Sequence, residues 1–110
     1  MSIRKKGRRQ ITVGGQVYIW YIAPDDDSPY QMLHIASADK YLILSCPLGT
    51  ATAYVISKGR IFRTQPTNGH WNRYLLPFAI PESITPKFVA SLITWASQSG
   101  DAEAYTGTFP

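Results

Sequence analysis

The sequence has little cysteine and no long apolar run. Cys46 is the only cysteine among 110 residues, so no disulfide can form within the chain, which is compatible with a reducing compartment. The most apolar stretch, Val17 to Ala23, is much shorter than the roughly 20 residues needed to cross a bilayer. The basic start is not followed by the apolar segment of a signal peptide. We therefore expect a cytoplasmic protein.

Residues that could carry chemistry are also scarce. Two histidines, His34 and His70, and Cys46 lie too far apart for a zinc pattern. Gly14-Gly15 is followed by no helix that could hold a phosphate, and no nucleophile-elbow motif is present. The carboxylates of residues 25–27 lie between two prolines without the spacing of a calcium loop, which predicts an exposed acidic loop. We expect no cofactor, no metal site and no catalytic residue, and hence a protein that is not an enzyme.

Positive charge is concentrated at one end. The first nine residues contain no acid and five basic residues, namely Arg4, Lys5, Lys6, Arg8 and Arg9. The rest of the chain holds six basic and seven acidic residues, a net charge of −1. This predicts a basic arm over residues 1–9, a single domain over 10–100 and a short tail over 101–110. Such an arm attracts nucleic acid or anionic surfaces, and a solubilising terminus is the alternative.

Alternating apolar residues predict antiparallel strands. The two glycines at positions 14 and 15 suit a two-residue hairpin turn, which pairs Val13 with Gln16 and Ile11 with Tyr18. The face of this hairpin that we expect to lie in the core carries Ile11, Val13, Tyr18, Trp20 and Ile22.

Two further hairpins follow along the chain. Residues 30–37 and 41–46 are expected to pair around Ala38-Asp39, with Ile35 opposite Leu42. Residues 52–57 and 60–64 are expected to pair around Lys58-Gly59. A seventh strand is predicted over 72–76.

The clearest element is a helix near the C-terminus. Thr85 is a suitable N-cap, Pro86 suits the first turn, and Gly100 is expected to end the helix. Its apolar side carries Phe88, Val89, Leu92, Ile93, Trp95 and Ala96. The predicted fold class is α+β: a mostly antiparallel β-meander of about six or seven strands with this helix packed on one face.

The opposite face of the sheet is the candidate functional surface. Its candidate binding residues are Ile19, Tyr21, His34, Tyr41, Tyr54 and Arg63. Aromatic and basic groups on an open sheet form protein interfaces or stack on unpaired bases. A third reading is that residues 65–81 fold over this face and bury it. The same pattern places His34 and Cys46 on opposite faces, so they cannot act as a catalytic pair.

Three stretches resemble a group of small bacterial proteins of unknown function. They are Val17-Tyr18-Ile19-Trp20 after the glycine turn, Lys58-Gly59-Arg60-Ile61-Phe62, and the segment from Ile84-Thr85-Pro86 to Trp95-Ala96. The resemblance implies a bacterial protein with a β-rich domain and a C-terminal helix that begins at Thr-Pro, and it implies no activity or site.

These observations favour a protein-interaction domain that associates through its sheet, with itself or with another protein. The alternative is a nucleic-acid-binding module that uses the basic arm and the aromatic face of the sheet.

Overall fold

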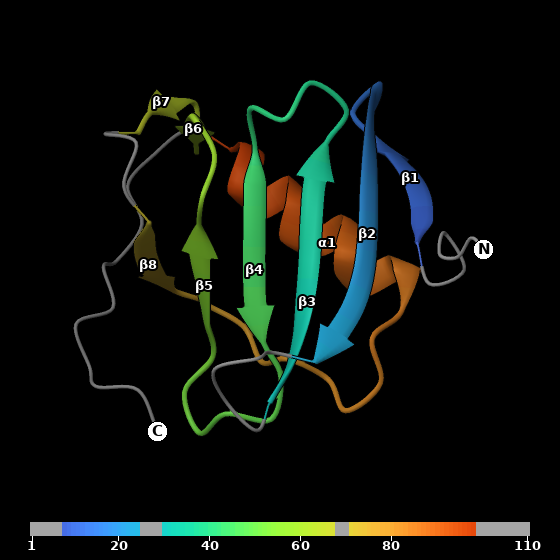
Figure 1. Cartoon of the computed structure of the whole chain (residues 1–110), viewed down its shortest axis with the longest axis vertical. Helices are drawn as coiled ribbons and strands as arrows, with labels where there is room; N and C mark the ends of the chain where they lie inside the picture. Colours follow the sequence, from blue (N-terminus) through green and yellow to red (C-terminus); the bar gives the residue numbers. More distant parts are fainter. Residues whose placement is uncertain (1–7, 25–29, 68–70, 99–110) are drawn as a thin grey trace.

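The computed structural model describes residues 8–24, 30–67 and 71–98. Six strands form one antiparallel sheet in the order β1-β2-β3-β4-β5-β8, and a single helix, α1, packs on it (Figure 1). A second sheet has two short strands, β6 and β7. The predicted α+β class is therefore confirmed. The elements are β1 Arg9–Val13, β2 Gln16–Pro24, β3 Gln31–Ser37, β4 Ile43–Pro47, β5 Tyr54–Ser57, β6 Ile61–Phe62, β7 Gln65–Pro66, β8 Asn72–Leu75 and α1 Pro86–Ser97.

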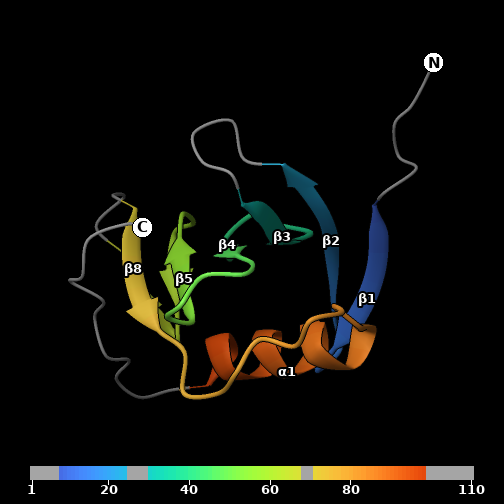
Figure 2. The same ribbon diagram turned by 90° about the horizontal axis from the view of Figure 1, so that it is seen from below.

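The six-stranded sheet curls around α1, which lies along its concave side (Figure 2). We call this side the inner face and the opposite side the outer face. The core lies between the inner face and the helix, and it contains Tyr18, Trp20, Leu33, Ile35, Leu42, Leu44, Cys46, Val55, Phe62, Val89, Leu92, Ile93 and Ala96. Apolar burial is the main stabilising term of a domain this size, so this core supplies most of the stability.

The first hairpin has the predicted register. Val13 pairs with Gln16 and Ile11 with Tyr18, and both turn glycines have positive φ, as a two-residue turn of this type requires. Tyr18 and Trp20 are buried on the inner face. Ile22 was wrongly expected in the core: it is 40% exposed, because the pairing of β2 with β1 runs only as far as Trp20.

The second hairpin is shifted by two residues from the expected register. Ile35 lies opposite Leu44 rather than Leu42, and the loop between the strands is longer than two residues. Side chains close it: Ser37 Oγ donates to Asp39 Oδ1 (2.6 Å), and the Tyr41 amide donates to the same oxygen (3.0 Å). Because a shift of two preserves the side-chain alternation, the predicted apolar face is still the buried one.

The third hairpin was predicted wrongly. β5 pairs with β4 on one side and with β8 on the other, while β6 pairs with β7 in the small sheet. The backbone amides of Arg60 and Ile61 both donate to the carbonyl oxygen of Tyr41. The chain after β5 therefore crosses toward the β3–β4 loop instead of folding back on β5.

The segment after β8 runs along the helix. Leu76, Phe78 and Ile80 pack against the core cluster, and the Phe78 ring makes edge contacts with Phe88 and Trp95. Figure 2 shows this segment passing beside α1 on the concave side of the sheet. The reading in which residues 65–81 bury the outer face is therefore wrong for the described part of that segment.

The helix begins as predicted. Thr85 Oγ1 accepts a hydrogen bond from the Phe88 amide (3.2 Å), and Pro86 occupies the first turn. The last helical residue is Ser97, with Gln98 as the C-cap, and Gly100 lies outside the described residues. Within the described part of the chain, no helix has the length and apolar character needed to span a membrane.

Candidate functional site

The outer face carries a row of side chains that crosses the sheet from strand to strand. Tyr21 on β2 lies opposite His34 on β3, and His34 lies opposite Ser45 on β4. The row continues through Ile56 on β5 to Arg73 on β8. Side chains at directly opposed positions of an antiparallel pair are close enough to interact. The sheet therefore aligns residues from five strands in one row on its outer face, in which Ser45 is buried.

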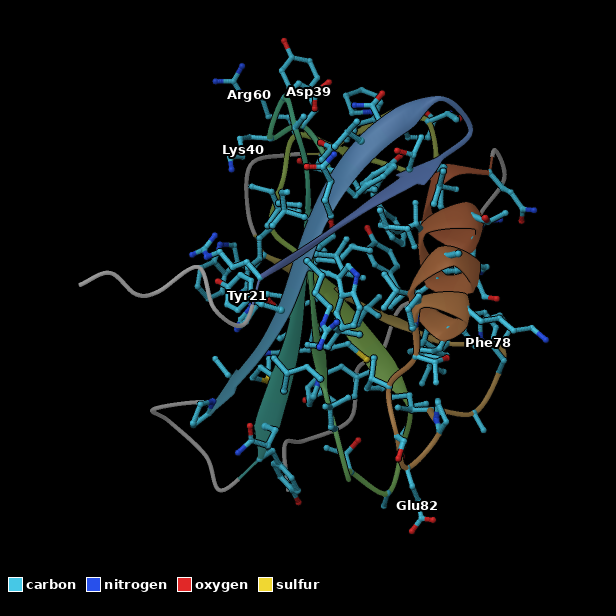
Figure 3. The ribbon with its side chains drawn as sticks, turned by 90° about the vertical axis from the view of Figure 1, so that its right-hand side faces the viewer. Tyr21, Asp39, Lys40, Arg60, Phe78 and Glu82 are labelled. Atoms are coloured by element: carbon cyan, nitrogen blue, oxygen red, sulfur yellow. The ribbon has the colours of Figure 1, made fainter. Side chains whose placement is uncertain are left out.

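Tyr21 is the centre of an aromatic and cationic contact. Its ring lies 5.0 Å from the His34 ring, centroid to centroid, and the Arg8 guanidinium lies 4.5 Å from the Tyr21 centroid. Figure 3 shows Tyr21 on the side of the sheet away from the helix. A cation over an aromatic face contributes about 0.5–1 kcal/mol at a partly exposed site. Arg8 thereby anchors the end of the basic arm to the outer face.

His34 is held by a second contact on its other side. Its Nδ1 lies 2.9 Å from Ser45 Oγ in a hydrogen bond whose direction depends on the imidazole tautomer. A serine beside a histidine is also the starting arrangement of nucleophilic catalysis. Ser45, however, is only 1% exposed, so its oxygen is not presented to a substrate. Within the described structure, the bond orients the imidazole.

Three other candidate binding residues, Ile19, Tyr54 and Tyr41, differ in their exposure and in their position relative to the outer face. Ile19 is half-buried on the outer face, two residues before Tyr21 and opposite Ala36. Tyr54 lies on the same side of the sheet but is buried, with 2% of its surface exposed. Tyr41 is exposed, and it lies in the β3–β4 loop with its ring beside the Arg60 guanidinium. Of these three, Ile19 alone adds accessible surface to the row.

Arg63 does not lie on the outer face, contrary to the prediction. Its guanidinium Nη1 donates to the Trp95 carbonyl oxygen (2.5 Å), and its backbone amide donates to the Ala96 carbonyl oxygen (2.9 Å). Both carbonyls belong to the last turn of α1. The positive φ of Arg63 and Thr64 turns the chain between β6 and β7, which carries the side chain to the helix end. A cation there interacts favourably with the helix dipole.

The basic arm is described only at its inner end. Arg8 contacts Tyr21, and Arg9 has its guanidinium 5.7 Å from the centre of the Trp20 ring. Arg4, Lys5 and Lys6 lie outside the described residues. Within the described part of the chain, each end of the row therefore carries a positive charge. Arg8 lies at the Tyr21 end, and Arg73 is the last residue at the other end.

Neither a metal centre nor a reactive thiol is formed by the described residues. No group of three or more His, Cys, Asp or Glu side chains within them could hold a metal ion. Cys46 is fully buried on the inner face, and burial raises the pKa of its thiol to about 12. His70 and residues 25–27 lie outside the described part.

Three members of the row, Ser45, Ile56 and Arg73, were not among the predicted site residues. Ser45 alternates with Cys46 along its strand, and its position beside His34 follows once β3 and β4 are aligned. Arg73 requires the pairing of β5 with β8, which spans the β6–β7 segment and has no local signal in the sequence.

Comparison of the chain with protein-family models, with curated proteins and with solved structures finds no match in any of the three. The candidate site therefore has to be interpreted from its own geometry.

Proposed function

We propose that this chain is a protein-interaction domain that associates through the outer face of its sheet, and that the partner is a second copy of the same chain. The observation that supports the proposal is the asymmetry of the sheet. Its inner face is covered by α1, whereas no described element crosses the outer face. That face still carries Ile19, Tyr21, Ile43 and Ile56, all half-buried.

The composition of this surface suits an interface. Tyrosine and arginine are enriched at the centres of protein interfaces, and lysine and glutamate are depleted there. Tyr21 is fixed between Arg8 and His34, so little side-chain entropy would be lost when a partner packs on it. Two copies related by a two-fold axis would bring the same apolar residues together, as a closed dimer requires.

The test is the oligomeric state of the full chain, measured by light scattering after gel filtration. The expected result is a dimer that dissociates in Tyr21→Glu and in Ile19→Lys. Tyr41→Glu makes the same exchange at an exposed tyrosine off this face and should leave the dimer intact. Circular dichroism of each variant confirms that the fold is retained. A wild-type monomer whose elution none of these substitutions alters would contradict the proposal.

A second candidate function, nucleic-acid binding, is supported by the contact of Arg8 with Tyr21. This contact joins the basic arm to an aromatic ring on the open sheet, the combination that binds unpaired bases by stacking and phosphates by charge. Tyr54 and Arg63 do not belong to this proposed nucleic-acid-binding surface. Tyr54 is buried, and Arg63 is bonded to the end of the helix.

Fluorescence anisotropy with a single-stranded oligonucleotide across a salt series tests this second function. Stacking predicts that Tyr21→Ala weakens binding by at least about fivefold, and that Arg8→Gln weakens it more than the matched exchange Arg60→Gln. Equal effects of the two arginine exchanges, with none from Tyr21→Ala, would leave only non-specific charge attraction.

The proposal carries two expectations from the sequence. A bacterial source is implied by the resemblance, and a cytoplasmic location is favoured by the single, buried Cys46.

A further inference from the structure

A concave site lies at one end of the molecule, away from the outer-face row. It is a cavity of about 210 Å³, which we call the rim pocket. The end of the first hairpin, the β3–β4 loop, the β6–β7 turn and the last turn of α1 converge on it. Its lining residues are Gln16, Tyr18, Ser37, Asp39, Tyr41, Leu42, Ile61, Arg63, Thr64, Ala96 and Ser97. The volume is several times that of one water molecule, so a small organic molecule would fit.

Asp39 is the acidic group of the rim pocket, and its carboxyl is held by hydrogen bonds. Oδ1 accepts from Ser37 Oγ and from the Tyr41 amide, and the Gln16 side chain also donates to the carboxyl. These donors favour the ionised carboxyl and hold the pKa of Asp39 below its usual range. Asp39 forms no ion pair with any described residue. The loop therefore fixes a carboxylate at the mouth of the cavity without neutralising it.

Arg63, the other charged residue of the lining, has a different role. Its guanidinium and backbone amide are bonded to the terminal carbonyls of α1, and its guanidinium carbon lies 5.2 Å from the centre of the Trp95 ring. The positive charge of Arg63 is thus directed at the negative end of the helix dipole. This leaves the carboxylate of Asp39 as the charge available to a ligand.

Tyr18 adds a polar group to the same cavity. Its side chain lines the rim pocket and is only 6% exposed. Its hydroxyl is not a buried group without a partner, since among the described residues Ser57 Oγ is the only such side-chain atom. The hydroxyl can donate to or accept from a polar group placed in the cavity.

The backbone around the rim pocket is strained. The three described non-glycine residues with positive φ are Lys40, Arg63 and Thr64. Arg63 and Thr64 line the cavity, and Lys40 lies between two lining residues, Asp39 and Tyr41. Positive φ is unfavourable for residues with a side chain, especially a β-branched one, and strained residues cluster at binding sites.

We propose that the rim pocket binds a small ligand that carries a protonated amine. The ammonium group pairs with the ionised carboxylate of Asp39, and the Tyr18 hydroxyl contacts the ligand deeper in the cavity. The source of the amine is either a free small molecule or the side chain of a lysine on another protein. The site is separate from the outer-face row and does not depend on the function proposed for that row.

The experiment tests the binding of three small molecules to the full chain. Binding is measured by calorimetry and by changes in amide chemical shifts in NMR. Putrescine represents a free amine, N-acetyl-lysine methylamide represents a lysine side chain, and 1,4-butanediol is the uncharged analogue of putrescine. The expected result is saturable binding of at least one amine, with shifts at Asp39 and Tyr41, and no binding of the diol. Tighter binding of putrescine assigns a small-molecule ligand, and tighter binding of the lysine derivative assigns a protein side chain.

Substitutions in the rim pocket decide whether the binding is specific. Asp39→Asn keeps an acceptor oxygen for the loop but removes the charge, and it should weaken amine binding by about tenfold or more, as expected for a lost charge-assisted hydrogen bond. Tyr18→Phe removes only the hydroxyl and should weaken it severalfold. Glu82→Gln removes a carboxylate at the opposite end of the molecule (Figure 3) and should change nothing. The proposal is overturned if no amine binds, if the diol binds equally well, or if Glu82→Gln has the same effect as Asp39→Asn.

Discussion

Gly59 packs directly against the backbone of Tyr41. A Cβ atom at position 59 would overlap the Tyr41 carbonyl oxygen and would lie 2.7 Å from the Ile43 amide nitrogen. That carbonyl oxygen also accepts hydrogen bonds from the amides of Arg60 and Ile61. The close approach therefore holds the segment after β5 against the β3–β4 loop, and so helps to form the rim pocket.

Gly59→Ala is expected to lower the free energy of unfolding by about 3 kcal/mol, at the upper end of the range for overpacking, because the neighbouring atoms are backbone and cannot rotate away. Urea denaturation measures the change. Gly15→Ala is the control variant: it introduces backbone strain at a positive φ without a steric clash. Gly15 has a φ of +80° but open space around it, so its substitution should cost only about 1–2 kcal/mol. An unchanged midpoint for Gly59→Ala would contradict the packing.

The first hairpin and the helix could be predicted because their signals are local. Two adjacent glycines leave one register for β1 and β2, and a Thr-Pro start followed by an apolar stripe defines α1. In the second hairpin the alternation identified the buried face but not the register. There, hydrogen bonds from Ser37 and Tyr41 to Asp39 close a longer loop than two turn residues would.

Pairing between distant strands could not be predicted in the same way. Lys58-Gly59 is a plausible hairpin turn by composition, but Gly59 is needed for a close backbone contact instead. For the candidate site, alternation correctly grouped Ile19, Tyr21 and His34 on one face. It misplaced Arg63, because the positive φ values of the β6–β7 turn, which redirect this side chain to the helix, have no sequence signal.

The N-cap of α1 gives a prediction of moderate size. Thr85→Ala removes the oxygen that accepts from the Phe88 amide, and it should destabilise the fold by about 1 kcal/mol. Thr94→Ala is the matched control, since Thr94 is exposed within the helix and alanine is the better helix former. Thermal unfolding of both variants should show a lower midpoint for Thr85→Ala alone. A lowered midpoint for Thr94→Ala of the same size would indicate a general effect of helix composition.

Cys46 should be unreactive while the protein is folded. It is fully buried, and burial raises the pKa of its thiol from 9.0 to about 12. At pH 8 this lowers the fraction of reactive thiolate by about a thousandfold relative to the unfolded chain. Modification by a disulfide reagent, followed with and without urea, measures the difference. The native reaction should be limited by unfolding, and similar rates in the two conditions would show that the thiol is accessible.

Asp39 makes the stability of the β3–β4 loop depend on pH. The Ser37 hydroxyl, followed by the Tyr41 amide, holds the pKa of Asp39 below its ordinary value of 3.8. The folded state therefore favours the ionised carboxyl more than the unfolded state does. This stabilisation is present above pH 3.8 and is lost as the pH falls through the lower pKa of the folded state.

The thermal midpoint of the wild type should therefore exceed that of Asp39→Asn most clearly near pH 6, and the difference should shrink as the pH falls below 3.8. The effect is small, because Asp39 is exposed to solvent. Glu82→Gln, measured in the same series, corrects for the loss of one exposed carboxylate. A difference between wild type and Asp39→Asn that stays constant down to about pH 2 would show that the hydrogen bonds to Asp39 do not depend on its charge. In that case the carboxylate of the rim pocket would not be held ionised by its loop.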